Sequence, residues 1–109
     1  MSMYGDYIKE KLGDEIIENN FGFITYRYLN VEQCYIVDIY VKPQYREGRV
    51  ATDLANLVLE EAKNFGCKEL LGTVVPSSKD STISLKVLLG YGMKLKQSLD
   101  NLIIFGKEI

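Results

Sequence analysis

Hydrophobic and polar residues follow regular periods along this chain, and the strand-like period is clearest in Cys34–Val41 (CYIVDIYV). β-branched and aromatic residues dominate this segment, as they do in buried strands. In an ideal strand its odd-numbered residues form one wholly apolar face, and its even-numbered residues, which include the single acid Asp38, form the other. Pro43 follows and ends the strand, because proline has no N–H group for a ladder.

Residues 49–65 have the period of an amphipathic helix. Val50, Leu54 and Val58 recur every four residues, and the apolar stripe continues through residues 62 and 65 and is widened at residue 57. Most of the charged residues of this segment fall outside the stripe. Gly66 follows at the position where glycine commonly ends a helix, so the pattern predicts a helix that packs one face on a sheet.

Shorter segments complete the predicted order, with helices at residues 4–12 and 81–89 and strands at residues 15–18, 23–29, 69–75 and 102–108. Short turns join the first three strands, which predicts two successive antiparallel hairpins. Strands 34–41 and 69–75 flank the helix of residues 49–65 and should be parallel, with a right-handed crossover. The expected fold class is α/β, a mixed and mostly antiparallel sheet with one central parallel strand–helix–strand crossover, in a single domain of residues 1–109.

Composition excludes several kinds of chemistry. The 109 residues are 47% hydrophobic, carry a formal charge of -2 and include no histidine. A Ser-His-Asp triad and an imidazole metal site are therefore excluded, and the mild acidity gives no footprint for nucleic acid. Cys34 and Cys67 lack metal or redox spacing, which favours buried free thiols over a disulfide. With no signal-peptide pattern and no apolar run of the ~18 residues that a membrane span needs, we expect a cytoplasmic protein without membrane contact or metal.

The segment from Val41 to Ala51 is the candidate for chemistry. A turn between a strand and a helix N-terminus aims backbone N–H groups at one point, which suits a phosphate or pyrophosphate. Gly48 keeps side-chain bulk low, and Arg46 and Arg49 add positive charge. Local features alone favour the simpler interpretation, an ordinary strand–helix turn with two solvated arginines.

The order of segments changes that balance, because it resembles the GNAT family of N-acetyltransferases. The central motif of that family is a strand ending in V-x-P-x-x-R, followed by x-x-G-x-G/A and a helix. Val41, Pro43, Arg46 and Ala51 match it in place. Residues 65–75, 81–93 and 100–109 resemble the later segments of the family, so the likeness covers residues 15–109 in order. The expected fold is GNAT-like and truncated at the N-terminus, since the usual first strand and first helix have no counterpart here.

The resemblance implies an acetyl-CoA-dependent N-acetyltransferase that acts on a primary amine of a small molecule or a protein. Backbone amides of the loop would hold the pyrophosphate, the preceding strand would bind the pantetheine arm and the thioester, and the last helix would flank the CoA tail. Carried over by position, the residues that bind acetyl-CoA are Ile39, Val41, Arg46, Glu47, Gly48, Arg49, Val50, Ala51, Ser81, Ser84 and Lys86.

Asp38 is the general-base candidate for the amine. It is the one acid inside the central strand, and burial there would raise its pKa, as a base requires. The equally weighted alternative is a structural acid, either paired with Arg27 or Lys42 or reaching solvent beneath a short helix. Glu32, in a turn, is a weaker candidate for the same role.

Three departures from the family pattern leave a second function open. Arg49 occupies the middle glycine position, where it would either crowd the pyrophosphate or help to hold it. The tyrosine that the family often uses as general acid falls at Leu88, and nearby Tyr91 is a weak acid candidate whose alternative role is a capping aromatic. With the elements that wall the acceptor site also absent, the alternative is a non-catalytic GNAT-fold binding or assembly module. A homodimer that supplies the missing wall is a further expectation.

Overall fold

A computed structural model describes residues 3–77 and 81–109, apart from the side chains of residues 8, 11, 12 and 81–85. Three α-helices, six strands and one short 3-10 helix occur in these ranges. Their order along the chain is α1 (Met3–Leu12), β1 (Glu15–Glu18), β2 (Gly22–Tyr28), β3 (Gln33–Val41), η1 (Pro43–Tyr45), α2 (Val50–Phe65), β4 (Glu69–Val74), α3 (Ser81–Gly90), β5 (Lys94–Leu99) and β6 (Leu102–Glu108).

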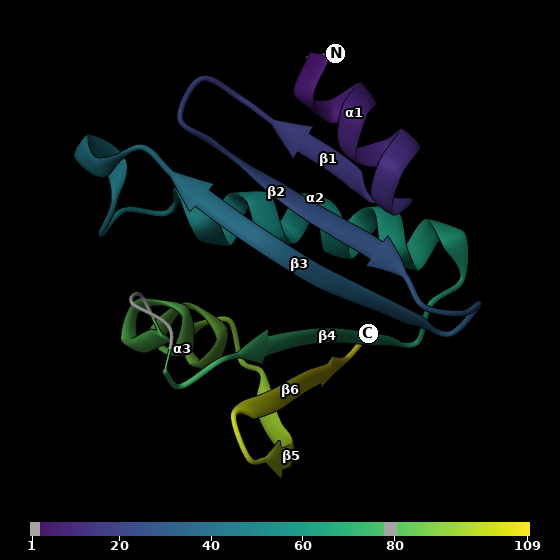
Figure 1. Ribbon diagram of the computed structural model, residues 1–109, viewed down its shortest axis with the longest axis vertical. Coiled ribbons are helices and arrows are strands. Elements are labelled where there is room, and N and C mark those ends of the chain that lie inside the picture. Colours follow the sequence, from purple (N-terminus) through teal and green to yellow (C-terminus); the bar gives the residue numbers. More distant parts are fainter. Residues whose placement is uncertain (1–2, 78–80) are drawn as a thin grey trace.

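The strands form one mixed sheet in the order β1-β2-β3-β4-β6-β5 (Figure 1). Only β3 and β4 are parallel, and the other neighbours are antiparallel. The two predicted hairpins and the predicted parallel crossover through α2 are therefore confirmed. The sheet holds the parallel pair at its centre because a crossover helix, unlike a tight turn, can bring the chain back to start a parallel strand.

Helix α2 follows the predicted stripe closely. Its buried side chains are Leu54, Ala55, Val58 and Ala62. Gly66 ends the helix in the left-handed conformation (φ 106°), and its N–H donates to the carbonyl of Ala62. The predicted stripe is wrong at residues 57 and 65, whose side chains are exposed, and residue 55 lies on the buried side instead.

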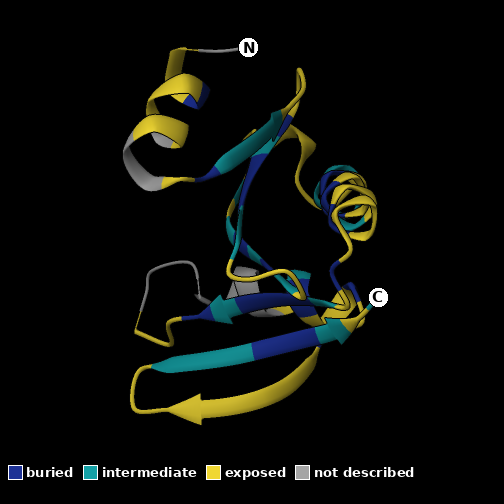
Figure 2. Cartoon of the chain, turned by 90° about the vertical axis from the view of Figure 1, so that its right-hand side faces the viewer, coloured by how far each residue is buried: buried dark blue, intermediate teal, exposed yellow. Residues whose placement is uncertain are grey.

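The helices lie on both sides of the sheet. Helix α2 covers one face, where its side chains share a core with Leu70 and Val74 of β4 and with Leu88 of α3. Helix α1 lies on the opposite face, where the Tyr4 ring contacts Phe23 (Figure 2). We refer to these two faces as the α2 face and the α1 face.

Strand β5 was not predicted. Its sequence, KLKQSL, is exposed at every position, and it pairs only with β6 at the edge of the sheet (Figure 2). A strand without a buried face carries no alternation of hydrophobic residues, so its pattern resembles a loop. The predicted end of the preceding helix is nearly right, with α3 ending at Gly90 and Gly92 in a positive-φ turn.

Both cysteines are buried free thiols, as the sequence favours. Burial raises the pKa of Cys34 to about 12, and the neighbouring Cys67 adds to the shift. Burial also raises the pKa of Cys67. Each thiol therefore belongs to the core packing and is not poised for nucleophilic or redox chemistry.

Candidate functional site

The two parallel strands separate at their carboxyl ends. Strands β3 and β4 pair only from Gln33↔Glu69 to Ile36↔Gly72, although β3 runs on to Val41 and β4 to Val74. Beyond the last pair each strand stays bonded to its outer neighbour alone, and the gap between them widens toward α3 and the loop before α2 (Figure 1). Backbone groups on the inner edges of this gap therefore have no partner on the facing strand.

A β-bulge in β3 decides which side chains face each side of the gap. Thr25 is opposite Asp38 but Tyr26 is opposite Ile36, so Val37 has no partner across the hairpin. The extra residue reverses the alternation of side chains along the rest of the strand.

The predicted faces of this strand are consequently wrong beyond the bulge. Cys34 and Ile36 lie in the core of the α2 face, and after the bulge Ile39 packs against the same core. Asp38 and Tyr40 lie on the α1 face and are exposed. A regular strand would have put Asp38 on the same side as Cys34, in the core.

The loop between β3 and α2 is tied to the end of β3. Arg46 donates from Nε to the carbonyl oxygen of Val41 at 2.9 Å, and its guanidinium lies 5.7 Å from the ring centre of Tyr40. This bond occupies the Val41 carbonyl, which the family resemblance assigned to the pantetheine arm, whereas Ile39 lies in the part of β3 that has no partner on β4. The loop therefore reaches the mouth of the gap through Arg46.

The N-terminus of α2 is open. The helix begins at Val50, and Arg49 at the N-cap makes no side-chain capping bond. The first N–H groups of a helix have no partner within it, so Val50 and Ala51 can donate to an anion and the helix dipole favours one. The Arg49 side chain is exposed and its Nε lies 3.9 Å from Oδ1 of Asp53, a distance that leaves it able to turn toward a phosphate.

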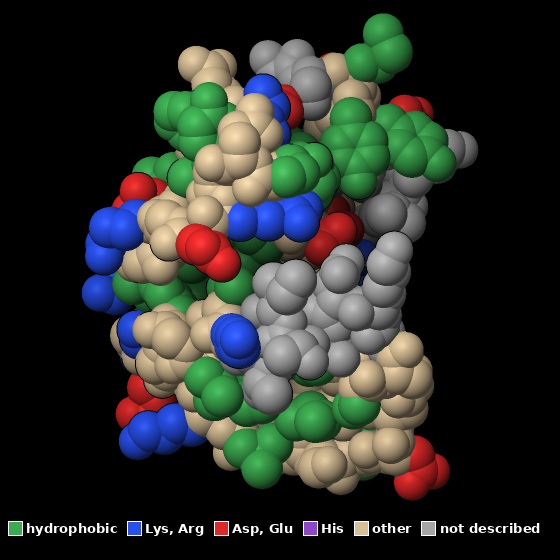
Figure 3. Space-filling view, turned by 90° about the vertical axis from the view of Figure 1, so that its left-hand side faces the viewer, with side chains coloured by type: hydrophobic (Ala, Val, Ile, Leu, Met, Phe, Trp, Pro, Cys, Tyr) green, Lys and Arg blue, Asp and Glu red, His purple; other side chains and the backbone are tan. Residues whose placement is uncertain are grey.

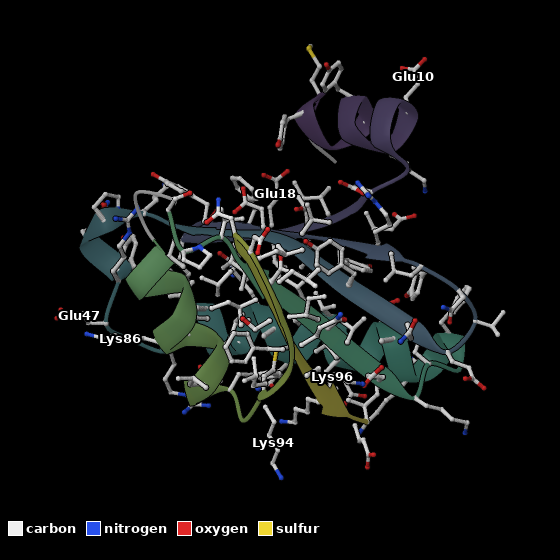
Figure 4. The ribbon with its side chains drawn as sticks, turned by 60° about the horizontal axis from the view of Figure 1, so that its bottom comes forward. Glu10, Glu18, Glu47, Lys86, Lys94 and Lys96 are labelled. Atoms are coloured by element: carbon white, nitrogen blue, oxygen red, sulfur yellow. The ribbon has the colours of Figure 1, made fainter. Side chains whose placement is uncertain are left out.

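The left-handed residue of the loop is Glu47, with φ 67°, and not its glycine neighbour. A Cβ atom added to Gly48 would lie 3.6 Å from the carbonyl oxygen of Tyr45, an ordinary contact. Gly48 is thus not required by its own backbone in this conformation. Figure 4 shows Glu47 and Lys86 of α3 pointing outward at the same end of the molecule.

The expected burial of Asp38 is wrong. The residue is exposed, and its Oδ1 accepts a hydrogen bond from the N–H of Ile39 at 2.9 Å. The expected partner Arg27 instead donates to Asp14, which raises the pKa of the guanidinium. Asp38 therefore reaches solvent, as one of the sequence alternatives expected, with one carboxylate oxygen bonded to the backbone of the next residue.

The remaining sequence candidates lie farther away or elsewhere. Glu32 lies in the turn before β3, at the opposite end of that strand from the gap. Tyr91 lies in the core of the α2 face and donates from its hydroxyl to Oδ1 of Asn56 in α2 at 2.7 Å. Burial raises the pKa of Tyr91, and its position fits the capping alternative. The side chains of Ser81 and Ser84 fall outside the described part of the chain, although their backbone belongs to α3.

Sequence reasoning missed a pair of hydroxyl groups at the base of the gap. Tyr35 Oη of β3 and Thr73 Oγ1 of β4 share a 2.8 Å hydrogen bond on the α1 face, one residue beyond the last parallel pair on β4. Tyrosines in strands mostly serve packing, so nothing in the sequence singles out Tyr35. Only the register of β3 against β4 brings the two hydroxyls together.

Other features of the surface do not converge on this gap. Two hollows lie at the other end of β4 and beside β5, and both include Glu69, whose carboxylate accepts from Lys96 and Gln33. Among residues 3–77 and 81–109, no cluster of three or more His, Cys, Asp or Glu side chains could hold a metal ion. Within the same ranges no helix is both long and apolar enough to cross a membrane.

Comparison with known proteins gives one family match. The model of the acetyltransferase (GNAT) family matches residues 8–87. No curated protein sequence matches the chain.

Solved structures share the fold at low identity. A GNAT family acetyltransferase from Elizabethkingia anophelis with acetyl-CoA bound has a TM-score of 0.74 at 19% identity, over 95% of this chain and 82% of that one. The PaiA N-acetyltransferase from Thermoplasma acidophilum, in complex with coenzyme A, has a TM-score of 0.77 at 16% identity, over 98% and 69%. A Bacillus subtilis acetyltransferase in complex with CoA has a TM-score of 0.72 at 16% identity, over 95% and 83%.

Proposed function

Because this chain belongs to the acetyltransferase (GNAT) family, we propose that it binds acetyl-CoA in the gap between β3 and β4 and transfers the acetyl group to a primary amine. The observation that carries the proposal is the coincidence of two features at one edge of the sheet. The parallel strands separate after Ile36↔Gly72, and the open N-terminus of α2 begins at Val50 beside the same edge. A long ligand with an anionic middle and an amide-bearing arm suits that pair of features.

The residues present fit such a ligand. Backbone N–H groups from residue 47 to Ala51 supply donors for the pyrophosphate, Arg46 can add its N–H by releasing the Pro43 carbonyl, and Arg49 adds an exposed positive charge. The stretch of β3 around Ile39 has no partner on β4, and it supplies the strand-like partner for the pantetheine amides once the Ile39 N–H is released from Asp38. Lys86 of α3 points outward at the same end and supports the tail of the cofactor (Figure 4). Acetyl-CoA supplies the acyl group as a thioester, in which the C–S bond is exchanged for the new C–N bond and the thiol leaves.

Asp38 acts as the general base in this proposal. Its exposed carboxylate borders the gap on the α1 face, where an amine can approach a thioester held between the strands. The carboxylate attracts the ammonium form and accepts a proton when nitrogen attacks, a role that contributes about 10²–10⁴-fold in rate. The hydroxyls of Tyr35 and Thr73 line the base of the same gap and orient the acceptor.

One observation favours the alternative of a non-catalytic module. Leu88, at the place of the tyrosine that the resemblance led us to expect, is buried with its methyl groups toward Gly72. It carries no proton to give to a leaving thiolate. The test therefore has to separate binding of acetyl-CoA from transfer.

Binding is measured by calorimetry and by the rise in melting temperature with acetyl-CoA, since a ligand of the folded state alone stabilises it. Transfer is followed as thiol release with a panel of primary amines. Asp38→Asn should fold and bind acetyl-CoA normally, because an amide oxygen still accepts from the Ile39 N–H, while turnover at neutral pH falls by at least about 10²-fold. Glu32→Gln is the matched control, because Glu32 is an exposed acid in the turn at the far end of β3, and it should keep full activity.

Each result of the binding and transfer measurements supports or excludes one of the two functions. A folded protein whose melting temperature does not respond to millimolar acetyl-CoA would refute the proposed site. Binding without transfer to any amine of the panel would support the non-catalytic module. Full activity of Asp38→Asn would place the base elsewhere.

For the loop, Arg49→Ala should weaken acetyl-CoA binding by about tenfold if the guanidinium reaches a phosphate, whereas tighter binding of Arg49→Gly would show that the side chain obstructs it.

A further inference from the structure

A row of aromatic rings on the α1 face continues directly from Asp38. In the register of β2 and β3, Phe23 lies opposite Tyr40, and Tyr40 is two residues from Asp38 on the same face. The ring centres of Phe23 and Tyr40 are 5.6 Å apart with planes at 28°, and Tyr4 of α1 adds a third ring at 5.8 Å from Phe23. We call Tyr4, Phe23 and Tyr40 the aromatic row.

Two of the three rings in the aromatic row are exposed, and Phe23 between them is half-buried. Tyr4 is 51% exposed and Tyr40 is 42% exposed, values well above those of tyrosines that serve sheet packing, such as Tyr26 at 6%. Figure 3 shows hydrophobic side chains over the upper part of the end of the molecule at which β3 terminates, and a second group over its lower part. Large apolar groups left in water at this point of the sheet cost free energy that a bound apolar group would recover.

Charges on the α1 face define what kind of molecule fits. Asp38 at one end of the aromatic row has no ion pair to another described residue, so its negative charge is available to an ammonium group. Arg46 places a positive charge over Tyr40, which disfavours a second ammonium group there. Glu18 of β1, opposite Phe23 and exposed, adds negative charge on the far side of the row.

Resting on the proposed function, we infer that the acceptor is a primary amine that carries an aryl group on a short alkyl linker. The ammonium binds Asp38 and the aryl group packs against the aromatic row. Residues two apart on one face of a strand are separated by about 7 Å, a span that a short linker bridges. The site therefore selects arylalkylamines over small alkylamines, which leave the rings in water, and over polyamines, which Arg46 repels.

The test is a comparison of kcat/KM for 2-phenylethylamine, propylamine and spermidine with saturating acetyl-CoA. We expect kcat/KM for 2-phenylethylamine to exceed that for each of the other two amines by at least about tenfold. One aromatic contact and the apolar area that it buries are enough for a preference of this size. Tyr40→Ala should raise the KM for 2-phenylethylamine about tenfold and leave that for propylamine unchanged, and Tyr40→Phe should restore the aryl preference. Because Tyr40 also contacts Arg46, the KM for acetyl-CoA is measured for each variant.

Tyr7→Ala is the matched control, since Tyr7 is an exposed tyrosine (55%) of the same helix as Tyr4. It should change none of these values. Equal use of propylamine and 2-phenylethylamine would overturn the inference while leaving the proposed function intact, as would a preference for spermidine that Glu18→Gln abolishes. A dimer that Tyr40→Ala dissociates, in a protein with no aryl preference, would also overturn it and assign the row to self-association. Failure of acetyl-CoA to bind at all is the separate failure of the proposed function.

Discussion

The loop before α2 offers a quantitative test, because its backbone strain lies at an unexpected residue. Glu47 is the one non-glycine residue within 3–77 and 81–109 that has a positive φ, at 67°. A side chain in this conformation costs about 1–3 kcal/mol. Gly48 has no such conformation, and a Cβ there meets only the Tyr45 carbonyl oxygen at 3.6 Å. Alanine should therefore be tolerated at Gly48 and glycine should relieve strain at Glu47, although the sequence places its glycine at position 48.

The expected changes in the free energy of unfolding come from strain in the folded chain and from the conformational freedom of the unfolded chain. Gly48→Ala restricts the unfolded chain without strain in the folded one and should stabilise by about 0.4–1 kcal/mol. Glu47→Gly relieves about 1–3 kcal/mol of strain and loses about 0.4–1 kcal/mol through the freer unfolded chain, so it should be neutral or stabilise by up to about 2.6 kcal/mol. In a domain of this size 1 kcal/mol moves the melting temperature by about 4 °C. Urea unfolding followed by circular dichroism gives the same difference independently.

The charge of Glu47 adds a second readout. Its carboxylate belongs to the loop that we propose binds pyrophosphate, so Glu47→Gly and Glu47→Gln should both tighten acetyl-CoA binding. Glu47→Gln keeps the φ strain and removes only the charge, which separates the two effects. A loss of more than about 1 kcal/mol in either Gly48→Ala or Glu47→Gly would refute the loop conformation and the reasoning built on it.

Three further predictions follow from the core and the edges of the sheet. Gly22→Ala should destabilise by about 1–3 kcal/mol or more, since its Cβ would lie 2.1 Å from the backbone oxygen of Tyr40; a neutral result in urea unfolding would contradict that close approach. The two buried cysteine thiols should react with a thiol reagent at neutral pH only after denaturation, and fast labelling of the native protein would show that they are accessible. Hydrogen bonds from Lys96 and Gln33 lower the pKa of Glu69 in the folded protein. The stability that they provide is complete above the pKa of Glu69 in the unfolded chain and is lost as pH falls through the lower pKa of the folded state. Glu69→Gln should therefore flatten the acid side of a profile of stability against pH, and an unchanged profile would exclude this contribution.

The sequence alone was enough to predict the scaffold that carries the candidate site. The spacing of Leu54 and Val58 with Gly66 after them predicted α2 to within one residue, because a helix that buries one stripe must repeat apolar residues at its own period. The crossover between the two apolar strands required them to be parallel, and the structure pairs β3 with β4 in that way. The spacing of Val41, Pro43, Arg46 and Ala51 likewise located the loop, since that spacing is a property of consecutive residues.

Tertiary structure alone decided how side chains meet at the site. The bulge at Val37 moves Asp38 from the core to the open α1 face, and a bulge arises from the pairing of β3 with β2, which no period within β3 records. The hydrogen bond of Tyr35 to Thr73 depends in the same way on the register between β3 and β4. Strand β5 escaped prediction because it is exposed on both faces and is held by hydrogen bonds to β6, an interaction that the backbone supplies whatever the side chains are. Local periodicity thus determines which elements form, whereas the contacts between residues distant in sequence determine which groups can act together.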